Sequence, residues 1–579
     1  MSKFYKNIFF AGILIFNFCH HTFSIATTVV NTNKCAGIFS LKTTEIFKDL
    51  WIKDLAQYAL LKAKPTLDIK TFNPLQGINV TKRDSHTNTA NKALFRILVD
   101  PHKTVYIVGD FNNWGENWKD DNGYYTKLDK RYQLTHNPID PNYQEIEIDV
   151  YHGMPYGFLI DGKIVFDPAA LYYTPKNYRH PLDPQGINGL NVMSVFWDLY
   201  RNDAPRTLGP VDLRGKPLII LETDLYGLIE KFAQGLTDKS KTYKYIAESG
   251  IINVLKESGI NMIWFLPITQ GDDGDIWHFR YLQYGLRAPS SLYGTPDEFI
   301  QMVNAFKKAG IGIMLDITIA HYAINGNVPP RQFLNSGLAN WTTTQGHMLY
   351  GTQKSPWGTY FYDFTNPYVK KFLIDNIIWL IKTYGISGLR LDAVDHLIGK
   401  YDPHKQYDTQ NNKYYNHPQA ALDFIKELIS TIHAYEPSVF VVAERFENTN
   451  SNILVKSSQN GGIGVNARFS PQIWEWVKYN YRAKTEDLNL YELQKTFNSL
   501  IRDNNSELFQ VTFISSHDKA SNVEDPFSAT GAYLASLVKE GGFFHQRGKA
   551  VSFTSLITLI NGASTHLMQD IILQEGDFY

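Results

Sequence analysis

Three acidic residues each follow a short apolar run, and their types suit chemistry on a glycosidic bond. Asp392 follows GLRL, Glu444 follows VFVVA, and Asp518 follows FQVTFIS and a short polar step. Cleavage of such a bond with retention of configuration needs one carboxylate as nucleophile and one protonated carboxyl group as acid and base, about 5–5.5 Å apart. Asp392 and Glu444 are the candidate pair, with Asp518 as a third carboxylate.

The neighbours of these acids predict which one is charged. Arg390 lies two residues before Asp392, so in a strand both side chains point to the same side. Its fixed positive charge is expected to keep Asp392 ionised. Glu444 is expected to keep its proton, because burial and a nearby like charge both raise the pKa of a carboxyl group. Further polar residues follow the same kind of run: Asp316, His321 and His517.

Apolar runs that alternate with amphipathic helical stretches predict the scaffold of this site. The runs are PLIILET, NMIWFLP, IGIMLDI, ISGLRLD, VFVVAER, GIGVNAR and FQVTFIS, with a weaker eighth run near residues 563–572. This pattern indicates a parallel sheet, and eight strands fit an α/β fold of the (β/α)8 barrel type, which carries its active site at the C-terminal ends of the strands. An open doubly wound sheet is the alternative, but the Gly-rich phosphate turn it would normally bring is absent from the sequence.

Four of these segments, in order, resemble the motif regions of the α-amylase family, glycoside hydrolase family 13. They are LDITIAH, GLRLDAVDH, VVAE and ISSHD. The resemblance covers about residues 216–579 and is nearest to the group of branching enzymes, isoamylases and maltooligosyl-trehalose trehalohydrolases. It implies an α-glucan or maltooligosaccharide substrate and no cofactor.

The resemblance also implies a role for each matching residue. Asp392 matches the nucleophile, Glu444 the general acid/base, and Asp518 the carboxylate that stabilises the transition state. His321 and His517 match histidines that bind sugar hydroxyls. The remaining matches are Arg390, which positions the nucleophile, its structural acidic partner Asp316, and Tyr281, which resembles the stacking tyrosine of the innermost subsite.

Two departures from the family pattern affect the site. The sequence around Tyr281 is unusual, so Phe279 or Trp277 are alternatives for the stacking role. Ala320 stands where many amylases carry a calcium-binding Asn, and the chain has no Cys/His cluster. We therefore expect no metal.

Residues 91–206 predict an immunoglobulin-like β-sandwich in front of the barrel. Short strands alternate with turns, and YGFLIDGKIVFD indicates a hairpin about an Asp-Gly turn. The stretch VYIVGDFNNW resembles the early-set, starch-binding-type sandwich of branching and debranching enzymes. Trp114 and Trp118 are the candidates for possible glucan binding on this sandwich, and a purely structural role is slightly favoured over it. The polar segment 81–91 is interpreted as part of a linker that ends an N-terminal segment, residues 27–90.

The first 26 residues predict a secretory signal peptide. Lys3 and Lys6 precede an apolar run at residues 8–18, and Ser24-Ile25-Ala26 offers a cleavage site. The run is shorter than the about 20 residues that span a bilayer, so a retained anchor is the weaker alternative. We expect a secreted protein, extracellular or periplasmic, with no membrane association after cleavage and with Cys35 as its only remaining cysteine.

Charge and length bound the remaining choices. The formal net charge is -1 over 579 residues, which gives no field that would favour nucleic acid. The catalytic barrel is expected over residues 212–579, with its last helix and a C-terminal sandwich missing. Either the barrel is truncated, with an open seam that exposes edge strands, or it closes in an unusual way.

Hydrolysis of α-glucosidic bonds is the favoured reaction, because export suits digestion of an outside glucan. Glucan branching, a transglycosylation, is the alternative, since both reactions share one covalent intermediate. A non-catalytic glucan-binding relic is the third hypothesis, motivated by the incomplete barrel.

Overall fold

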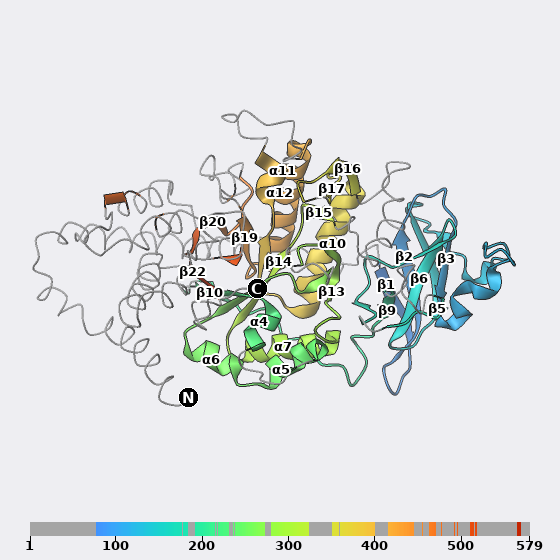
Figure 1. Cartoon of the computed structure of the whole chain (residues 1–579), viewed down its shortest axis with the longest axis horizontal. Coiled ribbons are helices and arrows are strands. Elements are labelled where there is room, and N and C mark those ends of the chain that lie inside the picture. Colours follow the sequence, from blue (N-terminus) through green and yellow to red (C-terminus); the bar gives the residue numbers. More distant parts are fainter. Residues whose placement is uncertain are drawn as a thin grey trace, which may run out of the picture.

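Eight parallel strands form a closed barrel at the centre of the computed structural model (Figure 1). Each strand pairs with the next, and the last returns to pair with the first over Leu218–Glu222 and Ser564–Met568. The predicted barrel is therefore confirmed, and of the two alternatives for its end the structure shows a closed barrel without an open seam. The strands are β10 (Leu218–Thr223), β11 (Met262–Phe265), β14 (Gly312–Ile317), β18 (Gly388–Leu391), β19 (Phe440–Glu444), β20 (Ala467–Ser470), β21 (Gln510–Phe513) and β22 (Ser564–Met568).

The structure describes most of residues 77–444 and short pieces beyond them. The ranges are 77–175, 178–182, 192–214, 216, 218–230, 236, 238–271, 280–322, 350–357, 359–399, 415–444, 454, 462–470, 476, 491–492, 495, 510–513, 516–517 and 564–568. The predicted signal peptide, both cysteines, Trp277, Phe279 and Asp518 lie outside these residues.

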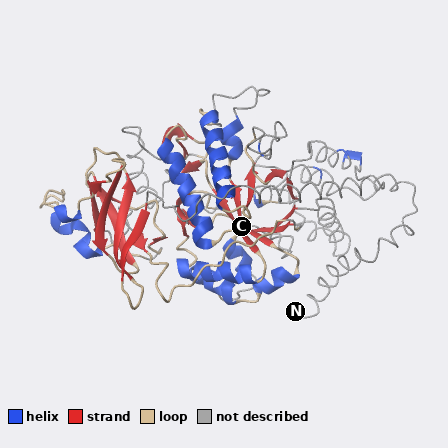
Figure 2. Ribbon diagram, turned by 180° about the vertical axis from the view of Figure 1, so that it is seen from behind, coloured by secondary structure: helices blue, strands red, loops and turns tan. Residues whose placement is uncertain are grey.

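Helices pack around the first half of the barrel and cover its strands (Figure 2). Their sequences explain where they begin. Thr295 and Glu298 form a reciprocal capping box at the start of one long helix, which satisfies two backbone donors. Among the described residues, no helix is both long and apolar enough to cross a membrane. The helices are α4 (Leu225–Glu230), α5 (Thr242–Glu248), α6 (Ile251–Glu257), α7 (Pro296–Lys308), α10 (Pro367–Tyr384), α11 (Val394–Ile398) and α12 (Pro418–Tyr435).

The inside of the barrel is a packed apolar core and not a pore. Its side chains come from alternate positions of the strands, and Phe469 stacks on Phe513 with ring centroids 4.1 Å apart. Leu213, in the segment that enters the barrel, packs against this core. A filled interior places any substrate site at an end of the barrel. Short pairs extend from the strand ends: β12 (Thr269–Gly271) with β13 (Gln283–Pro289), and β15 (His321–Tyr322) with β17 (Tyr360–Tyr362) and β16 (Tyr350–Lys354).

Two antiparallel sheets form the predicted sandwich beside the barrel. Phe95 of one sheet meets Tyr156 of the other edge-on at 4.9 Å. The Asp-Gly hairpin is confirmed, because both Asp161 and Gly162 adopt a positive φ between two paired strands. The first sheet contains β1 (Gly77–Arg83), β2 (Ala90–Leu98), β5 (Tyr143–Asp149) and β4 (Thr135–His136), and the second contains β3 (Val105–Gly109), β6 (Met154–Ile160), β7 (Lys163–Val165), β9 (Ser194–Phe196) and β8 (Tyr172–Tyr173).

The predicted linker at residues 81–91 is wrong. Residues 77–83 form β1, which pairs antiparallel with β2. The polar residues between them make a tight turn, in which the Asp84 carboxylate accepts hydrogen bonds from the backbone of His86 and Thr87. Short polar side chains stabilise turns in this way, so the polar composition of this segment belongs to a turn and not to a linker.

Trp114 and Trp118 do not form an exposed platform. Their residues are only 1% and 6% exposed. The Trp114 ring packs on His180 with centroids 4.2 Å apart, while the Trp118 ring packs edge-on against Tyr106 at 5.9 Å. Since a buried ring cannot stack on a sugar, the structure supports the favoured structural role of these two residues and not glucan binding through them.

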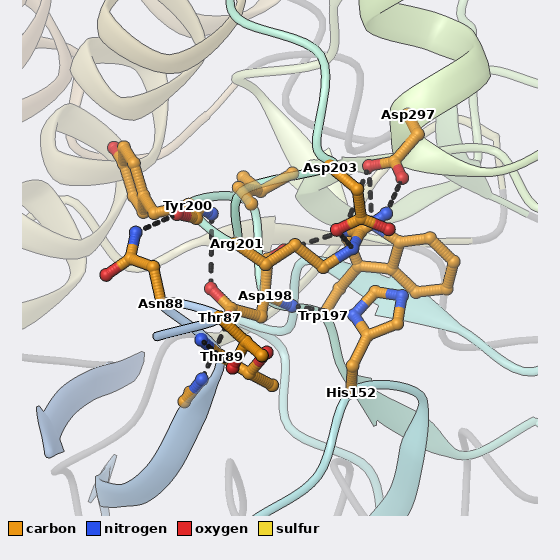
Figure 3. A network of polar contacts seen from close by, with 12 residues as sticks. Thr87, Asn88, Thr89, His152, Trp197, Asp198, Tyr200, Arg201, Asp203 and Asp297 are labelled. Atoms are coloured by element: carbon orange, nitrogen blue, oxygen red, sulfur yellow. Dashed lines mark hydrogen bonds and ion pairs between the residues drawn. The ribbon is translucent and has the colours of Figure 1, made fainter. Parts of the chain in front are cut away.

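A polar network joins the sandwich to the barrel (Figure 3). The indole of Trp197 donates to Asp297 in the first turn of α7 at 3.0 Å, and Arg201 forms an ion pair with the same carboxylate. On the sandwich side, both oxygens of Asp198 accept from the guanidinium of Arg83 at 3.0 Å. The segment after β9 is thereby bonded to both domains.

Candidate active site

Arg390 lies at the centre of a cluster of carboxylates at the C-terminal ends of three neighbouring barrel strands. It belongs to β18 and is paired in register with Asp316 of β14. Its side chain is 1% exposed and forms ion pairs with Asp316 at 3.0 Å, Asp392 at 2.5 Å and Glu444 at 3.0 Å. The short apolar strands place these residues at one end, because parallel strands all finish on the same side.

The candidate nucleophile and acid/base share one guanidinium. Nη1 of Arg390 donates to Oδ1 of Asp392, and Nη2 lies beside Oε1 of Glu444. The other oxygen of Glu444 accepts from the backbone N–H of Ala393 at 2.6 Å. The sequence therefore brings the predicted pair together, with both carboxylates held by fixed donors.

Ala393 has a backbone conformation that is rare for a residue with a side chain. Its φ is +54°, in the left-handed region. Such a conformation costs about 1–3 kcal/mol and occurs mainly at functional sites. Here it turns the N–H that follows Asp392 toward Glu444. Sequence reasoning missed this contact, because Ala carries no signal of positive φ.

Asp316 is surrounded by hydrogen-bond donors. Its Oδ2 accepts from the indole of Trp264 at 3.0 Å and from the hydroxyl of Tyr281 at 2.7 Å, while its Oδ1 accepts from Arg390. The residue is 1% exposed. This fits its predicted role as the structural partner of Arg390. Trp264 was not predicted, since its run reads only as a buried strand.

The two histidines lie on either side of this cluster. Nε2 of His321 is 3.9 Å from Oδ2 of Asp392, and its ring packs against Trp357 at 4.8 Å. His517 stacks on Tyr281 with centroids 5.3 Å apart and planes 18° from parallel. Tyr281 thus faces His517 and Asp316 in this state, so the predicted stacking residue is at the site.

Burial and charge crowding set the protonation of the cluster. Burial raises the pKa of Asp392 well above its ordinary value; Arg390 opposes this, while the charges of Glu444 and Asp316 add to it. Burial also raises the pKa of Asp316 to about 6, against the effects of Arg390 and His517. The expectation that Arg390 alone keeps Asp392 ionised is therefore corrected, because one guanidinium is shared by three carboxylates.

The excess of acid explains the direction of these shifts. Three ionised carboxylates around one guanidinium would leave an uncompensated negative charge in a buried site, which is costly. The charges of Glu444 and Asp316 therefore add to the raised pKa of Asp392. Retaining glycoside chemistry requires one protonated and one ionised carboxyl group side by side.

The described residues offer no group of three or more His, Cys, Asp and Glu side chains arranged for a metal ion. Ala320 is fully buried next to His321, and its methyl group offers no oxygen ligand. The third predicted carboxylate, Asp518, lies outside the described residues, although its neighbour His517 is at the site.

Comparisons with known proteins agree with this geometry. The α-amylase catalytic-domain family matches residues 337–525, a stretch that includes Asp392, Glu444 and Asp518. The 1,4-alpha-glucan branching enzyme of Butyrivibrio fibrisolvens is 27% identical over 378 residues, which are 62% of this chain and 52% of that enzyme. The branching enzyme of Halothermothrix orenii is 27% identical over 382 residues, 63% of this chain and 53% of the enzyme. The chain thus spans about half the length of these relatives.

Solved structures share the fold at low sequence identity. A pullulanase from Anoxybacillus sp. LM18-11, in complex with maltotetraose, matches with a TM-score of 0.55 and 14% identity, covering 88% of this chain and 69% of that one. The pullulanase from Bacillus acidopullulyticus matches with a TM-score of 0.55 and 15% identity, covering 88% and 60%. The solved structures thus share the fold of the chain, and residues 337–525 match the α-amylase catalytic domain.

Proposed function

We propose that the protein is a retaining enzyme that acts on α-glucans, with Asp392 as nucleophile and Glu444 as general acid/base. The observation that carries this proposal is the single guanidinium of Arg390, which contacts both carboxylates. It fixes them side by side at the end of the barrel where substrates of this fold bind. His321 and Tyr281 line the same place and would contact the sugar.

The reaction would proceed in two steps. An oxygen of Asp392 attacks the anomeric carbon while the carboxyl group of Glu444 gives its proton to the departing glycosidic oxygen. A glycosyl ester on Asp392 results. In the second step Glu444 removes a proton from the incoming hydroxyl, which attacks the same carbon and releases Asp392. The single proton of the acidic pair is thus used once and restored.

The incoming hydroxyl decides between the two candidate reactions. Water gives hydrolysis, which was the interpretation from sequence, whereas a glucan hydroxyl gives transfer. The similarity to branching enzymes favours transfer. We therefore propose branching of an α-1,4-glucan as the main activity, with hydrolysis as the second candidate because the fold also matches pullulanases.

One assay separates these activities. The purified full chain is incubated with amylose, and both iodine absorbance and reducing ends are followed. Branching lowers and shifts the iodine colour with few new reducing ends, while hydrolysis produces reducing ends in proportion. A protein that binds amylose on affinity electrophoresis but changes neither quantity would be the non-catalytic relic.

Export remains a separate proposal that rests on the first 26 residues alone. Their basic start, apolar run and small residues are typical of a secretory signal. Mass spectrometry of the mature N-terminus after expression in a secreting host tests it. A chain that keeps its first residues and stays inside the cell would argue against export and would suit glycogen synthesis.

A further inference from the structure

Glu222 is a buried acid at the site that the proposed chemistry does not use. It is the second-last residue of β10, the first barrel strand, and is 0% exposed. A carboxylate buried to this degree is costly unless it is paired and hydrogen-bonded. Its partner is His517, whose ring Nδ1 lies 2.6 Å from Oε1 and whose backbone N–H donates to Oε2 at 3.2 Å.

These contacts place a proton on Nδ1 of His517. Oε2 of Glu222 accepts from the backbone N–H, and a proton shared between Oε1 and Nδ1 lies on the more basic imidazole, whose ordinary pKa of about 6.5 exceeds that of Glu, about 4.3. The ring nitrogen at 2.6 Å must then be the donor. Glu222 and His517 therefore form a buried ion pair or a charge-assisted hydrogen bond, depending on the other nitrogen of the ring.

The other ring nitrogen is also a donor. Nε2 of His517 lies 3.0 Å from the hydroxyl of Tyr281. A tyrosine hydroxyl has one hydrogen, and that of Tyr281 is donated to Asp316 at 2.7 Å. Asp316 accepts at that oxygen, because its pKa of about 6 leaves it ionised at neutral pH, and an ionised carboxylate can only accept. Nε2 must then carry a hydrogen toward Tyr281, and the ring is an imidazolium.

Groups of alternating charge, linked through the hydroxyl of Tyr281, thus cross the mouth of the barrel from the first strand to the fourth. The described groups that face one another are Glu222 on β10, His517 after β21, Tyr281 before β13, Asp316 on β14 and Arg390 on β18. We propose that Glu222 is a positioning residue, which keeps the His517 ring doubly protonated and aims its Nε2–H at the wall of the sugar site. The effect of Glu222 on catalysis rests on the proposed function. The charge of the His517 ring is independent of that function.

The consequence for the reaction is electrostatic. A fixed imidazolium at this wall favours the ionised forms of Asp316 and Asp392, and its Nε2–H can be given to a sugar hydroxyl in place of Tyr281. Without Glu222 the ring would lose its charge at neutral pH, because the ordinary pKa of histidine is about 6.5. Whether Nε2 of His517 carries a hydrogen to donate to the sugar would then depend on which nitrogen of the neutral ring is protonated.

The test compares the wild-type chain with Glu222→Gln and Glu222→Asp. Histidine-labelled protein is examined by long-range 1H–15N NMR at pH 7.5, with the His517 signals assigned from their loss in His517→Asn. We expect both nitrogens of His517 to have imidazolium shifts in the wild type and in Glu222→Asp. In Glu222→Gln the ring should be neutral and titrate near its ordinary pKa.

Kinetics on amylose provide the second readout. We expect kcat/KM to fall about 10–100-fold in Glu222→Gln, as removal of an orienting partner typically does, with a new dependence on pH near 6.5 and with partial recovery in Glu222→Asp. A neutral His517 in the wild type, or a charged ring in Glu222→Gln, overturns the proposal. If Glu222→Gln does not fold, the wild-type and Glu222→Asp spectra still decide whether the His517 ring is charged.

A charged ring in a wild-type chain that leaves amylose unchanged would reject the proposed function and keep this inference.

Discussion

Two buried aspartates, one at the domain junction and one at the barrel mouth, have pKa values that are shifted in opposite directions. Asp198 is 2% exposed and Asp392 is 9% exposed, and each is paired with an arginine. Burial by itself raises the pKa of Asp198, but hydrogen bonds from Arg83 and from the backbone of Ala90 and Tyr200 bring it below its ordinary value. The pKa of Asp392 is raised well above the ordinary value.

The difference lies in how many acids share the donors. Asp198 has the guanidinium of Arg83 and two backbone N–H groups to itself. Asp392 shares Arg390 with Asp316 and Glu444. A carboxylate with its own donors is held ionised, whereas the sharing of one donor among three acids raises the pKa of Asp392. Burial alone does not explain why the pKa values of Asp198 and Asp392 shift in opposite directions.

Replacement of the nucleophile should give the largest effect. In Asp392→Asn the amide keeps the shape but cannot form the glycosyl ester, so activity on amylose should fall at least about 1,000-fold. Binding of amylose, measured by affinity electrophoresis, should be retained. Asp198→Asn is the matched control and should keep at least half of the activity. A tenth of wild-type activity in Asp392→Asn would move the nucleophile elsewhere.

Glu444→Ala should have a large effect that depends on the substrate. Turnover of glucan should fall about 100- to 10,000-fold, since the departing oxygen needs a proton. An activated aryl α-glucoside should lose much less, and azide should restore turnover. The basic limb of the pH profile on the activated substrate should flatten, because the variant lacks the proton that the wild-type pair loses. Equal losses on both substrates would point to another proton donor, with Asp518 as the next candidate.

At the junction, Asp198→Asn should reduce stability instead of activity. Loss of the charge should lower the free energy of unfolding by about 2 kcal/mol, since hydrogen bonds to charged groups contribute about 1.5–3 kcal/mol. A lowered pKa contributes stability that is present above the unfolded value near 3.9 and is lost as pH falls through the folded value. Urea unfolding between pH 3 and pH 7 should therefore show the difference at neutral pH and its disappearance in acid.

The smallest expected effect is that of a chelator. If the acids of the mouth are balanced by Arg390 and not by a bound ion, EDTA should leave activity on amylose unchanged. Ala320 in place of a ligand residue motivates this prediction. The control is a calcium-dependent amylase in the same buffer. Activity that is lost with EDTA and returns with calcium would show that a cation site exists.

The sequence by itself determined the elements and most of the chemistry. Strongly apolar runs predicted the barrel strands, because a strand buried on both faces needs them. The ends of those runs then identified Arg390, Asp392 and Glu444, since parallel strands collect their C-terminal residues at one mouth. Local signals also predicted the hairpin at Asp161–Gly162, where the turn requires a positive φ.

Only the tertiary structure decided which distant groups meet. The pairing of β22 with β10 closes the barrel, and the contact of Glu222 with His517 follows from it across the mouth; neither has a local signature in the chain. The burial of Trp114 and Trp118 depends on side chains from other strands, so a turn rich in tryptophan suggested an exposed surface that is in fact packed. The raised pKa of Asp392 was decided in the same way, because a pKa depends on how many charges share one donor, and that number exists only in the folded protein.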